Sequence, residues 1–231
     1  MFILEGNIGA GKSTLLKLIK EQLPHISVAL EPVDDWQKQI YGQSLLTNFY
    51  QNSKRWAYTF ETFTMMNRAK EHIALHAHNT LQIIERSVYS GYYCFARNSY
   101  EQGFLSPLEW KLYLEWYEWL VAQKCKAPQG FIYLRVDPQI AYERIRKRNR
   151  YAEKTMPLSY LKQIHNKHED FLITQATVAE QLKSVPILML DCNEEFVDNP
   201  VLLQKKFEQI QEFMGIAPVS GVQRPVVQCQ V

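Results

Sequence analysis

FILEGNIGAGKST, residues 2–14, joins an apolar run to a glycine-rich segment that ends in Lys, Ser and Thr. GNIGAGKST (6–14) has the P-loop spacing, in which a first Gly is followed after four residues by Gly-Lys-Ser. Its glycines let backbone N–H groups curl around phosphate oxygens, and the following helix adds its positive end. The alternative, a glycine-rich turn without a ligand, does not explain why all four elements occur between a strand and a helix. The segment therefore predicts binding of a nucleoside triphosphate with Mg²⁺.

Two side chains of this segment have specific expected contacts. Lys12 can reach the β- and γ-phosphates, and the Ser13 hydroxyl is the expected Mg²⁺ ligand. We expect ATP to contact the whole segment: Gly6, Asn7, Ile8, Gly9, Ala10, Gly11, Lys12, Ser13 and Thr14.

Short apolar runs alternate with longer helical patterns along the chain. This alternation predicts an α/β fold, a P-loop NTPase-type five-stranded parallel sheet with helices on both faces. We expect one domain, residues 1–214, and a loose tail, 215–231, which has no helical period. The predicted strands are 2–5, 27–31, 80–85, 130–136 and 186–191, and the predicted helices are 12–23, 54–78, 106–124, 137–148, 157–183 and 198–214.

The composition is that of an ordinary globular domain. Hydrophobic residues make up 46% and charged residues 22%, and the formal net charge of +2 gives no reason to expect a nucleic-acid partner. The four cysteines are scattered without CxxC pairs, which favours free thiols in a reducing compartment. No apolar run reaches the roughly 18–20 residues of a membrane span, and strand-like sequence begins at Phe2, so we expect no leader and a cytoplasmic location without membrane contact.

Charged residues stand where two predicted strands end. Glu31 ends the second strand, where α/β sheets place their active groups, and could take a proton from an attacking hydroxyl; an exposed strand-end acid is the alternative. Glu85 and Arg86 end the third strand in IIERSVYS (83–90). We expect Glu85 to reach Mg²⁺, directly or through water, and Arg86 to contact phosphate.

Three further patterns each allow two interpretations. RIRKRNR (144–150) suits an arginine-rich lid over phosphates better than a nucleic-acid site, because the chain is otherwise near neutral. His165 and His168 have a metal-compatible spacing, but solvated helix histidines are favoured because no further ligands accompany them. WKLYLEWYEWL (110–120) is too apolar for a free surface, so core packing and a dimer interface remain open.

Several of these segments occur here in one order together with further motifs, and they resemble the deoxynucleoside kinase family of deoxycytidine, deoxyguanosine and mitochondrial thymidine kinases. The similarity runs from residue 2 to about 214. Its segments are GNIGAGKST, EPVDDW (31–36), KRWAYTFETF (54–63), ERSVYS (85–90), RIRKRNR with MPLSYL (156–161), and HNKHEDFL (165–172). The resemblance implies transfer of the ATP γ-phosphoryl group to the 5′-hydroxyl of a deoxynucleoside in nucleotide salvage, by a Mg²⁺-dependent homodimer that its end-product triphosphate inhibits.

The resemblance also implies residue roles. Glu31 would be the general base, and Arg86 would hold it and the phosphates, with Lys12 as the third catalytic residue. Trp36, Phe60 and Phe95 would enclose the nucleobase, and Tyr50 and Glu153 would hold the sugar 3′-hydroxyl. Arg144, Arg148 and Arg150 would be lid arginines, and NEEF (193–196), with Glu195 and Phe196, resembles the loop over the donor base.

The chain departs from the family pattern in the expected base site. Glu61 replaces the usual Gln, Gly91 replaces an Asp, and Ala152 replaces an acidic lid residue, whereas Arg68 is retained. Glu61 and Arg68 are seven residues apart, close to two helical turns, so both should leave the same helix face.

Two hypotheses account for Glu61. An ionised carboxylate only accepts hydrogen bonds, which suits the N1–H and N2–H₂ donors of guanine, while Arg68 would serve O6 and N7; this favours a purine, deoxyguanosine. Alternatively, Glu61 replaces the missing Asp as the counter-charge of Arg68, through side-chain reach or water. A nucleoside monophosphate kinase, or a non-catalytic nucleotide-binding subunit like the relative in respiratory complex I, is the alternative function.

Overall fold

The computed structural model describes residues 1–38, 43–76 and 80–216. Most of the predicted tail, 217–231, therefore lies outside the described residues. The described strands form one five-stranded sheet in the order β2-β3-β1-β4-β5, and every neighbouring pair is parallel. The predicted α/β fold with a parallel sheet is confirmed. The strands are β1 (Phe2–Gly6), β2 (Ser27–Ala29), β3 (Gln82–Glu85), β4 (Gly130–Arg135) and β5 (Ile187–Asp191).

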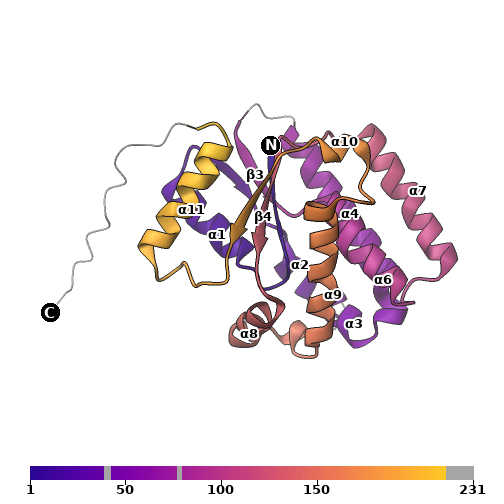
Figure 1. Ribbon diagram of the computed structural model, residues 1–231. Helices are drawn as coiled ribbons and strands as arrows, with labels where there is room; N and C mark the ends of the chain where they lie inside the picture. The colour runs from indigo at the N-terminus through magenta and orange to yellow at the C-terminus, as the bar shows by residue number, and fades with distance from the viewer. Residues whose placement is uncertain (39–42, 77–79, 217–231) are drawn as a thin grey trace.

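Helices cover both faces of the sheet (Figure 1). Successive strand residues point to opposite faces, so Ile3 and Tyr133 join a core with the helices on one face, whereas Leu4 and Ile132 join a second core on the other. The first core lies under α4 (Ser53–His76), α7 (Pro107–Gln123) and α9 (Leu158–Glu169), and the second under α1 (Lys12–Gln22) and α11 (Pro200–Phe213). Burial on both faces explains why the strands have continuous apolar sequences.

The long helices match their predicted positions, with one exception. The predicted helix 157–183 is wrong as a single element, because α9 passes into a π-helical turn, η3 (Asp170–Thr174), and α10 (Glu180–Lys183) follows separately. Gln175, with φ of 53°, ends the first part in the left-handed region. Short elements were missed because they are too short to show a period: α2 (Val33–Gln37), α3 (Leu45–Gln51), α5 (Val88–Ser90), the π-helical η1 (Gly91–Ala96), α6 (Arg97–Glu101) and the 3₁₀ turn η2 (Tyr151–Glu153).

The chain direction places the predicted chemistry at one edge of the sheet. All strands run in parallel, so their carboxyl ends meet at the lower edge in Figure 1, beside α8 (Pro138–Arg148). The P-loop follows β1, and Glu31 follows β2. Glu85 is the last residue of β3, and Arg86 comes directly after it. Crevices at the carboxyl edge are where open α/β sheets bind ligands.

The face of α4 that carries Glu61 and Arg68 is buried. Glu61, Met65 and Arg68 are all less than 9% exposed, as their spacing of four and three residues predicts for one helix face, and the neighbouring Phe60 is buried with them. Phe63, by contrast, is 46% exposed on the outer side. The expectation that the two charges share a face is confirmed.

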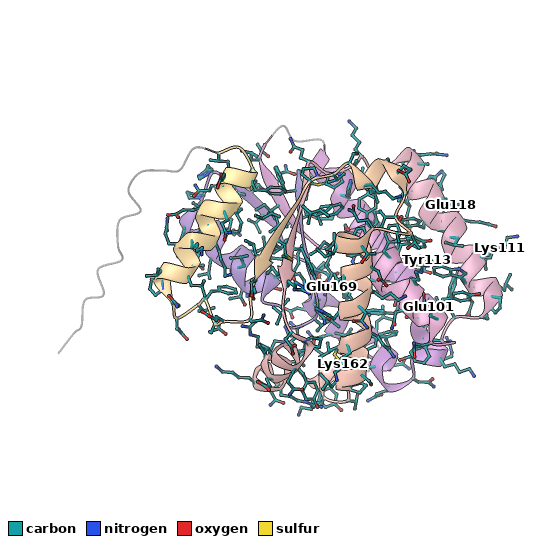
Figure 2. The ribbon with its side chains drawn as sticks, in the orientation of Figure 1. Glu101, Lys111, Tyr113, Glu118, Lys162 and Glu169 are labelled. Carbon is teal, nitrogen blue, oxygen red and sulfur yellow. The ribbon has the colours of Figure 1, made fainter. Side chains whose placement is uncertain are left out.

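The aromatic helix α7 divides its apolar residues between two faces. It begins with a capping box, in which Ser106 Oγ accepts from the N–H of Glu109 and Glu109 accepts from the N–H of Ser106. Tyr113 lies on the inner side of α7, whereas Lys111 points away from the domain (Figure 2). A neighbouring face of the helix carries an exposed apolar stripe: Leu108, Leu112, Trp116 and Trp119. Core packing therefore accounts for only one side of this helix.

The interpretation of the two helix histidines as solvated is wrong for His168, whereas the side chain of His165 is 17% exposed. His168 is fully buried, its Nδ1 lies 2.8 Å from the carbonyl oxygen of Ile164, and its ring stacks on Tyr133. Burial holds the pKa of His168 well below its ordinary value, so this side chain is a neutral part of the core.

Among the helices of the described residues, none is long and apolar enough to cross a membrane.

Candidate active site

The P-loop lies closely against α8 and needs its glycines for that reason. A Cβ at Gly9 would lie 2.5 Å from the carbonyl oxygen of Ala141, and φ of Gly9 is 81°. Gly11, with φ of 94°, is the N-cap of α1. The Asn7 side chain donates to the carbonyl oxygen of Leu161 and accepts from the N–H of Ile8, which joins the loop to α9. The loop therefore has the curled backbone that a phosphate cradle requires.

Lys12 is folded onto the P-loop. Its Nζ donates to the carbonyl oxygens of Gly6, at 3.1 Å, and Asn7, at 2.8 Å. Burial, with a further contribution from the charge of Arg86, lowers the pKa of Lys12 to about 7. A triphosphate on the loop would favour the charged ammonium again, because a nearby opposite charge raises the pKa of an amine.

Ser13 and Glu85 lie together beside the P-loop. Ser13 Oγ donates to Glu85 Oε1 at 2.8 Å, and Glu85 Oε2 accepts from the backbone N–H of Glu31 at 3.2 Å. No group of three or more His, Cys, Asp or Glu among the described residues could cage a metal ion. Mg²⁺ in kinases is held by one or two protein ligands together with substrate phosphates and water, so this hydroxyl and carboxylate fit Mg²⁺.

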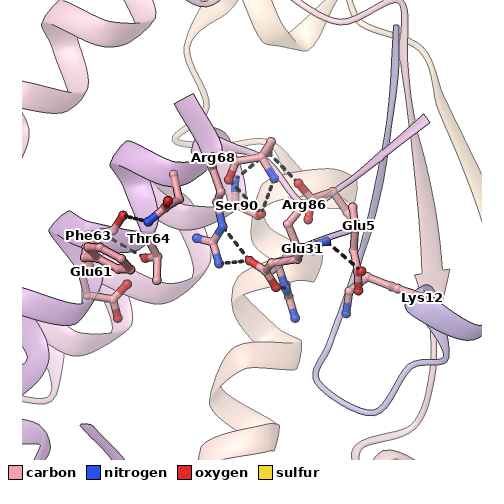
Figure 3. A network of polar contacts seen from close by, with 12 residues as sticks. Glu5, Lys12, Glu31, Glu61, Phe63, Thr64, Arg68, Arg86 and Ser90 are labelled. Atoms are coloured by element: carbon pink, nitrogen blue, oxygen red, sulfur yellow. Dashed lines mark hydrogen bonds and ion pairs between the residues drawn. The ribbon is translucent and has the colours of Figure 1, made fainter. Parts of the chain in front are cut away.

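Glu31 lies between two arginines (Figure 3). Its Oε1 accepts from Arg68 Nε at 2.9 Å and Nη2 at 2.6 Å, and its Oε2 lies 3.2 Å from Arg86 Nε. The Glu31 side chain is only 6% exposed. Burial by itself would raise the pKa of Glu31, but the charges of Arg68 and Arg86 outweigh it, so the pKa lies below its ordinary value. The alternative of an exposed strand-end acid is therefore wrong.

Arg86 adopts a backbone conformation that is unusual for a residue with a side chain. Its φ is 63°, in the left-handed region, and its N–H donates to the carbonyl oxygen of Leu4. The next residue, Ser87, donates from Oγ to the buried carboxylate of Glu5. Arg86 Nη1 is buried without a hydrogen-bond partner among the described residues. Such strain is stored at functional sites, and here it aims the guanidinium at Glu31.

Aromatic side chains line the same cavity on the side of α3 and α4. Phe60 stacks on Phe49 with ring centroids 4.5 Å apart and meets Trp36 edge-on at 6.0 Å. Phe95 packs under Arg86, with 4.5 Å from Cζ to the ring centroid. This wall is flat and apolar with charged groups at one end, which suits an aromatic ligand with a polar edge.

Glu61 lies in this wall and is almost completely buried. Its Oε1 accepts from Ser99 Oγ at 3.0 Å, and its side chain makes no ion pair with Arg68. Burial raises the pKa of Glu61 to about 7, against the lowering effect of Arg68 and Ser99. Arg68 forms its ion pair with Glu31, so the direct form of the counter-charge hypothesis, a side-chain contact between Glu61 and Arg68, is wrong. A counter-charge that acts through water stays a prediction.

The lid arginines are paired with acidic or carbonyl oxygens. Arg148 and Arg150 both contact Glu153, at 2.6 Å and 3.3 Å. Arg144 instead donates to the backbone carbonyls of Cys192, Asn193 and Glu194 and lies 3.9 Å from the carboxylate of Glu195, so it binds the loop before Phe196.

The structure brings most predicted site residues together. Gly91 is an exception, because it lies behind Arg68 and not on the cavity wall. Gly6, Asn7 and Ala10 belong to the P-loop but are buried and do not line either cavity. The predicted residues that line the first cavity are Ile8, Gly9, Gly11, Lys12, Ser13, Thr14, Glu31, Trp36, Tyr50, Phe60, Glu61, Arg68, Glu85, Arg86, Phe95, Arg148, Arg150 and Glu153. An adjoining cavity contains Gly9, Gly11, Thr14, Arg144, Arg148, Glu195 and Phe196.

Five residues in the wall of the first cavity or in contact with it were not predicted from the sequence. Val33, Leu46, Phe49 and Tyr160 line this cavity, and Ser99 donates a hydrogen bond to Glu61. Phe49 and Leu46 belong to the short helix α3, which showed no period, and Ser99 is 38 residues from its partner. Only the aromatic pair in NFY (48–50) was a local signal for this wall.

Comparison with known proteins gives consistent matches over nearly the whole chain. Residues 2–215 match the family model described as deoxynucleoside kinase. The chain is 37% identical to deoxycytidine kinase 2 of Gallus gallus, with 91% of this chain and 89% of the relative covered. It is 36% identical to the mitochondrial deoxyguanosine kinase of Xenopus laevis, covering 92% and 88%, and 34% identical to human deoxycytidine kinase, covering 92% and 90%.

We expect Glu61 to make stability depend on pH. Its folded pKa of about 7 exceeds the ordinary 4.5, so the folded protein keeps a proton that the unfolded chain has released, and stability falls as pH rises from 4.5 through 7. Glu61→Gln removes this loss. Its free energy of unfolding relative to the unmodified protein should increase by about 2–4 kcal/mol between pH 4.5 and pH 8.

Urea denaturation at a series of pH values measures this difference. Glu71→Gln, at an exposed position of the same helix, is the control and should show no such trend. A difference between Glu61→Gln and the unmodified protein that stays constant with pH contradicts a raised pKa for Glu61.

Proposed function

The chain belongs to the deoxynucleoside kinase family, and from this premise we propose how its residues transfer the γ-phosphoryl group of ATP to the 5′-hydroxyl of a deoxynucleoside. The observation that carries the proposal is the position of Glu31. Its buried carboxylate lies in one cavity with Lys12, Ser13, Glu85 and the aromatic wall. A nucleoside on that wall would present its 5′-hydroxyl between Glu31 and the P-loop.

Glu31 is the proposed general base. The bond between the 5′-oxygen and the γ-phosphorus forms while the bond to the β,γ-bridging oxygen breaks, ADP leaves with that electron pair, and the 5′-hydroxyl proton passes to Glu31. A carboxylate of low pKa suffices because the hydroxyl becomes acidic only late in phosphoryl transfer. Its depressed pKa keeps Glu31 ionised at neutral pH and ready to accept the proton.

Positive charge supplies most of the acceleration in this proposal. Lys12 and Arg86 would stabilise charge on the transferring phosphoryl group, and Arg148 and Arg150 would approach it from the lid. Bound Mg²⁺ would neutralise phosphate charge, with Ser13 and Glu85 as its protein ligands. The adjoining cavity with Arg144, Glu195 and Phe196 would take the adenine of ATP.

The nucleoside would lie along the aromatic wall. Phe60, Trp36 and Phe95 would enclose the base, since flat rings stack on aromatic faces. Tyr50 and Glu153 lie in the same cavity and would bind the 3′-hydroxyl. Burial and the charge of Glu153 raise the pKa of Tyr50 far above its ordinary value, so its phenol stays a hydrogen-bond donor.

Glu61 is proposed to select the base. When ionised it only accepts hydrogen bonds and suits guanine, which presents adjacent N1–H and N2–H₂ donors. When protonated it has one donor and one acceptor, the same set as glutamine, and then suits cytosine or adenine as well. The pKa of about 7 makes the ionised form and deoxyguanosine increasingly favoured above neutral pH.

A homodimer is proposed from the exposed apolar stripe on α7. Leu108 is 68%, Trp116 48% and Trp119 40% exposed. Leu112, which is also exposed, lies between Leu108 and Trp116, so the four residues are separated by three or four positions and form one row along the helix. A contiguous apolar face on one helix is typical of an interface. A second copy of the chain would cover it with its own α7 in a two-fold arrangement.

A cytoplasmic location is also part of the proposal. Cys94, Cys125 and Cys192 are buried free thiols, as suits a reducing compartment. The relative from Xenopus laevis is named mitochondrial, so subcellular fractionation of a tagged full chain is the direct measurement.

Glu31→Gln should reduce turnover by about 10²–10⁴-fold, because the amide cannot take the proton. ATP binding should persist, since the partners of the Glu31 side chain in the described part of the chain are Arg68 and Arg86 and not residues of the P-loop. Steady-state phosphorylation and binding of a fluorescent ATP analogue measure the two effects. Exposed Glu71→Gln is the matched control, and near-normal turnover by Glu31→Gln would remove Glu31 as the base.

Deoxyguanosine should have the highest kcat/KM among the four natural deoxynucleosides, and its lead should grow as pH rises through 7. Glu61→Gln should lower this preference by about 10-fold or more and abolish its pH dependence. Thymidine as the best substrate contradicts the purine proposal. Preferential phosphorylation of deoxynucleoside monophosphates would favour the monophosphate kinase alternative.

Trp116→Glu should dissociate the dimer, raising its dissociation constant about 30-fold or more, as expected for a central aromatic residue. Light scattering after size-exclusion chromatography measures the mass. Lys111→Glu, on the same helix beside the stripe, is the control. A wild-type chain that stays monomeric at high micromolar concentration contradicts the proposed interface.

A further inference from the structure

Two buried polar atoms near Gly91 have no hydrogen-bond partner among the described residues. A Cβ at this position would lie 2.9 Å from Arg68 Nη1 and 3.9 Å from Tyr113 Oη. Both Nη1 and Tyr113 Oη are buried and lack a hydrogen-bond partner among the described residues. Any side chain at residue 91 would therefore meet the Arg68 guanidinium directly, and an acidic one would pair with it.

Without such a partner, Arg68 directs its remaining nitrogens to one acceptor. Nε and Nη2 donate to the same oxygen, Glu31 Oε1, and the two side chains are 8% and 6% exposed. Breaking a buried pair leaves an uncompensated charge and is costly. The contact therefore holds the carboxylate in one orientation.

The two oxygens of Glu31 are left in different states. A carboxylate oxygen has two lone pairs, and both of those on Oε1 are used by Arg68. Oε2 lies 3.2 Å from Arg86 Nε and keeps a lone pair for a further donor. Glu31 lines the cavity, so Oε2 is the atom that a substrate hydroxyl can use.

We infer that Arg68 is a positioning residue for the catalytic base: it occupies Oε1 of Glu31, so the 5′-hydroxyl gives its proton to Oε2, and the missing side chain at Gly91 commits Arg68 to this contact. The inference rests on the proposed function, in which Glu31 is the base. It gives Arg68, on the nucleobase side of the cavity, a direct effect on the chemical step.

Other charges near Glu31 must be held constant in a test. Arg68 and Arg86 lower its pKa most strongly, followed by Lys12. Glu61 titrates near 7 in the same cavity, so Glu61→Gln is the suitable background. The charged and titratable groups that face Glu31 or line its cavity are Lys12 from the P-loop, Glu61 and Arg68 from α4, Glu85 and Arg86 from the end of β3, Tyr50 from α3, Arg148, Arg150 and Glu153 from the lid, and Tyr160 from α9.

The experiment compares Arg68→Met, Gly91→Asp and Gly91→Ala in the Glu61→Gln background. Single-turnover phosphorylation is followed from pH 5 to 8 with saturating deoxynucleoside, ATP and Mg²⁺. Arg68→Met should move the acid limb of the rate to higher pH by about 1–3 units, because an adjacent opposite charge lowers a carboxyl pKa by that much. Gly91→Asp should move it less in the same direction, since the introduced carboxylate would share the Arg68 charge. Gly91→Ala, whose Cβ displaces Arg68 Nη1 without adding a charge, should move it less than Gly91→Asp.

Two results overturn the inference. In the first, Arg68→Met changes only the KM for the deoxynucleoside and leaves the acid limb in place, which would make Arg68 a binding residue alone. In the second, Gly91→Asp and Gly91→Ala behave alike; this pair decides if Arg68→Met does not fold. Failure of the proposed function has another signature, because Glu31→Gln would then retain normal turnover.

Discussion

The buried contact between Glu31 and two arginines determines how the active site is built. A charge removed from water must be paired, and here the partners come from α4 and from the turn after β3. The ion pair between Glu31 and Arg68 holds the end of the edge strand β2 against α4, the long helix that carries part of the aromatic wall. The same contact keeps Glu31 ionised, which is the state that a general base needs.

The parallel sheet brings these parts together. Its strands are paired in the order β2-β3-β1-β4-β5, so the P-loop after β1 lies next to the end of β3, and Glu31 follows the strand beyond it. The link is visible in the hydrogen bonds: Glu85 accepts from Ser13 on one side and from the Glu31 backbone on the other. The expected phosphate, metal and base positions are therefore neighbours because their strands are neighbours.

The charge pattern of α4 has a different meaning in the structure from the one its sequence suggested. Glu61 and Arg68 share a buried face, as their spacing predicted, but they do not form a pair. Arg68 turns to Glu31, and Glu61 is held by Ser99. One charge thus lies at the Glu31 end of the cavity, while the other stays among aromatic rings, where burial raises its pKa to about 7.

The sequence by itself determined the fold class, the P-loop and the strand-end groups Glu31, Glu85 and Arg86, because these depend on local periodicity and on short motifs with fixed spacing. It also located most of the cavity wall through resemblance. Tertiary structure alone decided the partner of Arg68, the burial of His168, the contact of Arg144 with the loop at 192–194, and the wall residues from α3. Those outcomes depend on which side chains meet between different elements, such as Arg68 and Glu31, which are 37 residues apart, and on the close packing of Arg68 against Gly91. No local sequence pattern encodes these contacts.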